Sequence, residues 1–293
     1  MTRRCVAAVA LTCVVLAGES QIVAQGAVQK SFVFPEDAVR ALTIAAGASN
    51  VDELLAIFGP DSKELIASSD AATARRNREV FTVAIAEGWR LQDESPTRKT
   101  LVIGNEDWPF PVPLVKTAGR WRFDTAAGKE EVLARRIGRN ELAVVAVCRT
   151  YVKAQRHYAE QGHDGQPAGR FATAFRSDPG RQNGLYWPDK RGQPRSPLGE
   201  LVAQAAEEGR SIGADRESPS PFHGYYFKML TSPGGFGLVA WPVEYNATGV
   251  MSFIVNQDGV VREKDLGPKT DAAVAGMTKY SPDASWRAVS PAR

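Results

Sequence analysis

One long stretch with a helical pattern, residues 128–161, constrains the fold of this chain most. Its apolar side chains recur at a spacing that places them on one face of a helix: Leu142, Val145, Cys148, Val152 and Tyr158. Strand-like patterns lie on both sides of it, within residues 101–123 and 224–263. This break in period, together with the length of the chain, predicts two α+β domains, residues 31–127 and 128–293.

The first domain begins with helices. Pro35 suits the first position of a helix, and Asn50 with Glu53 forms a capping box for a second one. Gly59-Pro60 ends that second helix, and residues 71–87 carry apolar side chains at helical spacing for a third, with Val80, Phe81, Ala84 and Ile85 as its apolar face.

Strands follow these helices. Residues 101–103, 112–116 and 121–123 read as strands, and Ala118-Gly119 joins the last two as a hairpin. The prolines within Trp108–Pro113 each remove a backbone donor, so this segment is an extended edge or a rigid loop.

Two short motifs of this half resemble a known fold. They are Pro35-Glu36-Asp37-Ala38-Val39 and Gly119-Arg120-Trp121-Arg122-Phe123-Asp124. Both are similar to motifs of the nuclear-transport-factor-2-like and cystatin-like domains. The resemblance implies a cone in which helices cover an antiparallel sheet.

The second domain pairs the long helix with β structure. Residues 224–230, 235–242, 249–255 and 260–263 read as four strands, with a turn at Asn256–Gly259 between the last two. The order of a helix and four strands is similar to the globular part of type IV pilins and pseudopilins, which implies a long helix packed on a four-stranded antiparallel meander. A pilin helix begins as an apolar segment, whereas Glu130–Glu141 is charged, so the fold is expected without the pilin role.

Several longer motifs resemble a family of exported bacterial proteins catalogued only as a domain of unknown function. They are Trp108-Pro109-Phe110-Pro111-Val112-Pro113-Leu114-Val115, Arg136–Leu142, Gly184-Leu185-Tyr186-Trp187-Pro188, Phe222–Phe227 and Phe253–Gly259. The resemblance supplies no catalytic residues. Members of that family often carry an acidic loop suited to calcium, but here Gly162–Pro167 holds one carboxylate, too few for calcium, so no metal site is expected.

The first 24 residues have the features of a secretory signal peptide. Arg3 and Arg4 precede a short apolar run, Cys5–Gly18, and cleavage is expected just after Ala24. The run is too short to span a bilayer, so we expect a periplasmic or secreted bacterial protein with no stable membrane span after cleavage. Cleavage leaves Cys148 as the one cysteine, expected to be buried.

Charge limits the partners. Loss of Arg3, Arg4 and Glu19 with the signal peptide lowers the net charge from +3 to +2. Basic and acidic residues are therefore nearly balanced, which argues against a nucleic-acid partner. No sequence pattern for a cofactor is present, and we expect none.

Candidate site residues are few. Asp107, Asp124 and His223 are the candidates for acid–base catalysis, with His223 as a general base, although a turn residue is the simpler interpretation of His223. His157, His163 and Asp164 read as a solvated helix end rather than a metal site. Arg135, Arg136 and Arg139 with Glu130, Glu131 and Glu141 read as a salt-bridged helix face. Loop aromatics beside prolines can form a binding surface, and these are Trp108, Phe110, Tyr186 and Trp187.

The sequence favours a non-enzymatic binding or assembly factor whose partner is an envelope protein or a glycan. The alternatives are a hydrolase or isomerase that uses a cavity in the N-terminal cone, and a pilus-associated subunit. The first alternative requires ionisable groups inside the cone. The second requires a long helix exposed along an apolar side.

Overall fold

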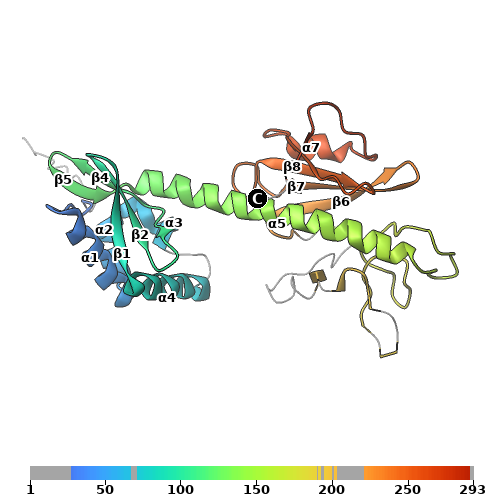
Figure 1. The fold of residues 1–293 in the computed structure, drawn as a ribbon, viewed down its shortest axis with the longest axis horizontal. Coiled ribbons are helices and arrows are strands. Elements are labelled where there is room, and N and C mark those ends of the chain that lie inside the picture. The colour runs from blue at the N-terminus through green and yellow to red at the C-terminus, as the bar shows by residue number, and fades with distance from the viewer. Residues whose placement is uncertain are drawn as a thin grey trace, which may run out of the picture. The chain divides into compact units, whose positions relative to one another are not determined.

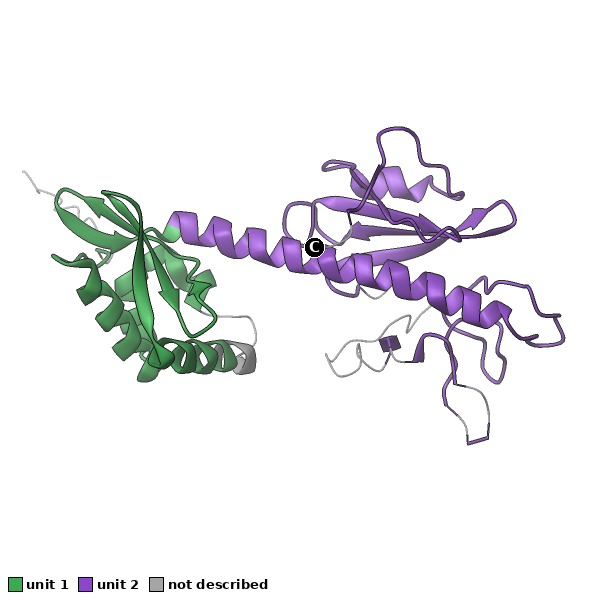
Figure 2. Ribbon diagram, in the orientation of Figure 1, with its two compact units in different colours: residues 1–125 green, residues 126–293 purple. Residues whose placement is uncertain are grey.

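The computed structural model describes residues 28–66, 71–189, 191–192, 195–199, 201–202 and 221–290. The expected signal peptide, residues 1–24, lies outside this part of the chain. The fold is mixed α+β, as expected, with helices and an antiparallel sheet in the first half and a long helix and a second antiparallel sheet in the second (Figure 1). The chain forms two compact units, residues 1–125 and 126–293 (Figure 2). The domain boundaries expected from the sequence, 31–127 and 128–293, stay a prediction.

Unit 1 places helices before a sheet. Its helices are α1 (Pro35–Gly47), α2 (Val51–Phe58), the 3-10 helix η1 (Pro60–Ser62), α3 (Lys63–Ile66) and α4 (Ala71–Glu87). Its strands are β1 (Trp89–Ser95), β2 (Arg98–Ile103), β3 (Trp108–Pro109), β4 (Leu114–Thr117) and β5 (Arg120–Phe123). The strand order is β1-β2-β4-β5, with β3 also paired to β2, and every pairing is antiparallel.

Local sequence signals set most of these boundaries. Pro35 occupies the start of α1, and the Asn50 side chain caps α2 by accepting a hydrogen bond from the backbone N–H of Glu53 at 3.0 Å. The Glu53 carboxylate bonds Lys30 instead of closing the capping box. Helix α2 ends at Phe58, before Gly59-Pro60, as predicted.

The predicted hairpin is confirmed. Ala118 and Gly119 have φ of 49° and 79°, the left-handed values of a two-residue turn, and Thr117 pairs with Arg120 across it. Strand β4 begins at Leu114, two residues later than predicted, because Pro113 has no N–H to donate. Strand β1 was not predicted, since its residues are mostly polar and exposed.

The core of unit 1 is apolar. It joins α1, α2 and α4 to the inner face of the sheet through Leu42, Ile57, Phe58, Ile85, Leu101, Ile103, Leu114, Trp121 and Phe123, among others. On α4 the predicted apolar face is wrong at one position. Val80 is 61% exposed, whereas Ile85 is buried and Phe81 packs against the core.

Unit 2 is built on the long helix α5 (Thr125–Ala159), whose first residue belongs to unit 1. The strands are β6 (Tyr225–Ser232), β7 (Gly235–Pro242), β8 (Met251–Asn256), β9 (Arg262–Asp265) and β10 (Arg287–Ala288), in the spatial order β10-β9-β8-β7-β6. The predicted four-stranded antiparallel meander is confirmed, and β10 adds a fifth strand. Helix α7 (Thr270–Ala275) packs on the sheet face opposite α5, and neither α7 nor β10 was predicted (Figure 1).

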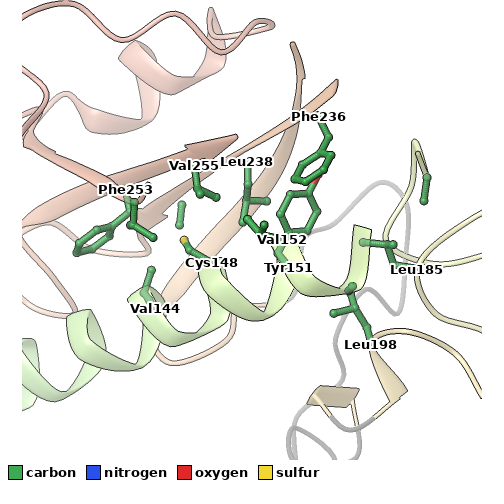
Figure 3. Packing of buried hydrophobic residues seen from close by; sticks show 14 of the residues in the cluster. Val144, Cys148, Tyr151, Val152, Leu185, Leu198, Phe236, Leu238, Phe253 and Val255 are labelled. Atoms are coloured by element: carbon green, nitrogen blue, oxygen red, sulfur yellow. The ribbon is translucent and has the colours of Figure 1, made fainter. Parts of the chain in front are cut away.

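The buried stripe of α5 faces the sheet. Val144, Cys148, Tyr151, Gln155 and Tyr158 recur at intervals of four and three residues and are buried. Figure 3 shows the first three of these side chains among those of the sheet. Burial raises the pKa of the Cys148 thiol to about 12, so this cysteine behaves as a small apolar side chain, as expected. The predicted stripe is wrong at its first residue, because Leu142 is 66% exposed.

A buried polar network links α5 to its surroundings. The Gln155 amide donates to the carbonyl of Ala172 and accepts from its N–H, both at 2.9 Å. The same amide donates to the Tyr151 hydroxyl at 3.1 Å, and that hydroxyl donates to the carbonyl of Gly237 in β7 at 3.0 Å. One helix face therefore holds both a loop and a strand.

A second polar connection lies nearer the start of α5. Glu141 Oε1 accepts hydrogen bonds from the backbone N–H groups of Val250 and Met251, both at 2.9 Å. Asn140 Nδ2 donates to the carbonyl of Thr248 at 2.8 Å. The expected salt-bridged face is present at Arg135–Glu131, with Nε and Oε1 2.7 Å apart, but Glu141 holds the loop before β8 instead.

Gly249 and Gly138 provide a matched test of packing in unit 2. A Cβ at Gly249 would lie 1.9 Å from the hydroxyl oxygen of buried Tyr225, whereas a Cβ at Gly138 meets nothing within 4 Å. We expect Gly249→Ala to lower the free energy of unfolding by about 2–3 kcal/mol through overpacking. Gly138→Ala should raise it by about 0.5–1 kcal/mol, because alanine favours the helix. Urea unfolding measures both, and equal effects would contradict the packing described here.

Candidate functional site

Exposure separates the tryptophans of unit 1 into two groups. Trp89 and Trp108 are 39% and 44% exposed, whereas Trp121 is 5% exposed. Exposed indole rings indicate a surface available for contacts. Trp108 was predicted as a binding residue, and Trp89 was not.

The two exposed tryptophans lie on one face of the sheet. Ile103 of β2 is in register with Trp89 of β1 on one side and with Trp108 of β3 on the other. Residues directly opposite one another on neighbouring antiparallel strands direct their side chains to the same face. Both rings therefore flank buried Ile103 on the face that packs against the helices.

Trp108 is the outer member of an aromatic chain that runs into the core. The centroid of Phe110 lies 6.3 Å from that of Trp108, 5.5 Å from Phe81 of α4 and 6.2 Å from Phe123 of β5. Phe110 is half-buried, and Phe123 is 1% exposed. We call Trp108, Phe110, Phe81 and Phe123 the Trp108 cluster. The structure thus brings together two predicted binding residues, Trp108 and Phe110, and anchors them to the core.

An ion pair fixes the turn before Trp108. Asp107 has a left-handed φ of 54°, and its Oδ1 lies 2.7 Å from Nη1 of Arg90. The pair joins the residue after Trp89 to the residue before Trp108 and leaves no net charge between them. Both side chains are more than half exposed, at 53% and 71%, so the pair contributes little stability and acts mainly on geometry.

The acid–base candidates of unit 1 lie outside its core. Asp107 is the exposed partner of Arg90, and Asp124 has a 31% exposed side chain with Oδ2 3.6 Å from Nη1 of Arg98. Among the described residues of unit 1, Ser62 is the one polar residue that is buried. This core therefore brings no acid and base together in the part of unit 1 that the structure describes.

The third catalytic candidate, His223, belongs to unit 2 and occupies a turn. Its φ is 49°, and that of Gly224 is 72°, while Phe222 and Tyr225 exchange backbone hydrogen bonds across the two residues. The His223 ring lies 4.0 Å from that of Phe222. His223 therefore occupies a turn, which was the simpler of its two interpretations from the sequence.

The predicted aromatics of the second loop are placed differently from Trp108. Trp187 is 4% exposed and belongs to the core of unit 2, with its ring 5.6 Å from that of His163. Tyr186 is half-buried, and the guanidinium of Arg176 lies 5.8 Å from its ring centroid. Of the four predicted binding aromatics, Trp108 is therefore the one that is exposed.

The histidines at the end of α5 are engaged in packing and hydrogen bonds. His163 stacks on Tyr158 at 4.2 Å, and its Nε2 lies 3.0 Å from the Tyr158 carbonyl. His157 contacts Glu160, with Nδ1 and Oε2 3.1 Å apart, and Asp164 accepts from Arg181. In the described ranges no three His, Cys, Asp or Glu side chains group as metal ligands would.

Exposed Trp108 and buried Trp121 should differ in their contributions to the stability of unit 1. Trp108→Ala should lower the free energy of unfolding by roughly 1 kcal/mol, since much of the ring already faces water. Trp121→Ala should lower it by about 3–5 kcal/mol, because it removes a buried ring. Thermal unfolding of both variants measures the difference, and a larger loss for Trp108 would assign that residue to the core.

Comparison with known proteins shows the family of this chain. The family model described as "Protein of unknown function (DUF2950)" matches residues 29–289, and the chain belongs to that family. The match covers both compact units. No curated protein and no solved structure matches the chain.

Proposed function

We propose that this protein is an exported bacterial envelope protein that binds a protein partner through the exposed end of the Trp108 cluster, without catalysing a reaction. The observation that carries the proposal is the exposure of Trp108, 44%, in a unit whose other core-facing rings, apart from that of Trp89, are buried or half-buried. Its half-buried neighbour Phe110 joins this ring to the core, so the surface is rigid and apolar.

The chemistry around Trp108 favours a protein partner over a glycan. A glycan needs hydrogen-bonding groups beside the aromatic ring, and the carboxylate of Asp107, the residue before Trp108, pairs with Arg90. Pro109 has no N–H, which disfavours addition of a further strand at β3. The remaining mode of binding is contact with apolar side chains of a folded protein, and aromatic residues contribute much of the binding energy at such interfaces.

The two alternatives have less support. An enzyme in the N-terminal unit needs an acid and a base together in its interior, and Asp107 and Asp124 lie at the surface. A pilus-associated subunit needs a long helix with an open apolar side. The C-terminal half of α5 instead packs on β7 and β8 on one side and on Ala172, Leu185 and Leu198 on the other (Figure 3).

Export is part of the proposal and rests on residues 1–24. Among the described residues, no helix is both long and apolar enough for a membrane crossing. Expression in a Gram-negative bacterium should give a periplasmic or secreted chain that begins at Gln25, as N-terminal sequencing would establish. Arg3→Glu with Arg4→Glu should retain the precursor in the cytoplasm. Cytoplasmic, unprocessed wild-type chain would contradict export.

Affinity capture from envelope extract tests the binding role. The wild-type chain and Ile44→Ala, which alters a 72% exposed apolar residue of α1, should retain the same protein. Trp108→Ala should lose most of that protein while it melts within a few degrees of wild type, because a central aromatic residue often carries an interface. The proposal would be overturned if all three forms retained the protein equally or if none retained a protein. Retention of a glycan in place of a protein would show that the proposed class of partner is wrong.

A further inference from the structure

A second aromatic pair lies in unit 2, on the sheet face that carries α7. Tyr226 of β6 and Trp241 of β7 are in register, with ring centroids 5.6 Å apart and ring planes at 45°. Both side chains are half-buried, whereas Trp187 and Trp286 are 4% and 6% exposed. Trp241 is therefore the tryptophan of unit 2 that reaches solvent.

A carboxylate holds the Trp241 ring in place. The indole N–H donates to Oδ1 of Asp271, in the first turn of α7, at 2.8 Å. The inner side of the ring packs against the core formed by Leu230, Val239, Ile254, Val274 and Trp286. The ring is thus fixed by one hydrogen bond and by packing, which reduces the entropy that a ligand would have to overcome.

Two residues in contact with this ring, Tyr226 and Asp271, carry polar atoms that a ligand could use. In the part of the chain that the structure describes, the Tyr226 hydroxyl makes no hydrogen bond. Asp271 accepts the indole N–H with Oδ1, and its other oxygen, Oδ2, accepts no hydrogen bond there. A ligand on the ring would therefore find one phenol that donates or accepts and one carboxylate oxygen that accepts.

The local charges select a neutral ligand. Asp271 disfavours anions, since a carboxylate and an anion repel each other. Lys228 lies two residues from Tyr226 on the same face of β6, and its Nζ donates to the carbonyls of Val274 and Ala275 at 2.9 and 3.3 Å. An aromatic pair beside a carboxylate is otherwise suited to a cationic ligand. The ammonium group of Lys228, fixed by these two hydrogen bonds, repels such a ligand.

We propose that Tyr226, Trp241 and Asp271 form a saccharide-binding site. A pyranose ring has an apolar C–H face and a rim of hydroxyl groups. The C–H face stacks on Trp241 beside Tyr226, and a hydroxyl group donates to the free oxygen of Asp271. This site differs from the Trp108 cluster, where the neighbouring charges pair with each other, and it does not rest on the proposed protein partner.

Titration with neutral tetrasaccharides tests the site. The probes are β-1,4-linked tetramers of glucose, mannose and N-acetylglucosamine, added to the chain from residue 25 and followed by NMR of the indole N–H groups. We expect the Trp241 signal to shift with at least one probe. Tyr226→Ala and Asp271→Asn should each weaken binding by about tenfold, the equivalent of one stacking or hydrogen-bonding contact.

Matched variants separate this site from other effects. Tyr245→Phe removes a half-buried tyrosine hydroxyl that bonds Asp265, outside the site, and should leave the affinity unchanged. Trp108→Ala should also leave it unchanged, so failure here and failure of the protein-binding proposal are distinguishable. No shift with any tetramer, equal binding by the Tyr226 and Asp271 variants when folded, or binding of choline in place of the tetramers would overturn the assignment.

Discussion

The buried amide of Gln155 is the interaction on which unit 2 depends most. It is fully buried and pairs with both backbone groups of Ala172, much as a neighbouring strand would. Through the Tyr151 hydroxyl the same network reaches Gly237 of β7. Removal of one partner would leave buried polar groups without hydrogen bonds, which costs more than the bonds themselves contribute. A loop, a helix and a strand are thereby locked into one arrangement.

The polar groups of both units are used mainly to hold the fold, and the aromatic rings that reach solvent stand out against this background. Glu141 holds the loop before β8, and Arg90 with Asp107 holds the turn before β3. Trp108 and Trp241 each lie on a sheet face with one side of the ring anchored by neighbouring aromatic or apolar side chains. Rigid support of this kind suits recognition, because little freedom is lost on binding.

Local signals explain why much of the fold was predictable. Pro35, Asn50 and Gly59-Pro60 act within one helical turn, and the Ala118-Gly119 turn acts within four residues. The missed elements lack such signals: β1 is polar, and β10 has two residues. On α5, Leu142 and Val144 are both apolar and lie two positions apart. Val144 is the buried residue of the two because it lies on the helix face that packs against the sheet.

The candidate site shows the same limit. Trp108 and Trp187 both stand beside prolines in loops, so the sequence treats them alike. Trp187 is buried because His163 and the core of unit 2 surround it, and these contacts join residues far apart in the chain. Glu141 likewise bonds residues 109 and 110 positions away, which no local pattern predicts.

Native-state hydrogen exchange at Ala172 tests most directly whether unit 2 is a rigid scaffold for its aromatic surface. This residue lies outside every helix and strand, yet its N–H donates to Gln155 in a buried site. We expect this amide to exchange as slowly as the buried amides of α5, within about tenfold, because both open only when the unit unfolds. Exchange at the rate of an unprotected loop amide would contradict the rigid network and the scaffold role assigned to it.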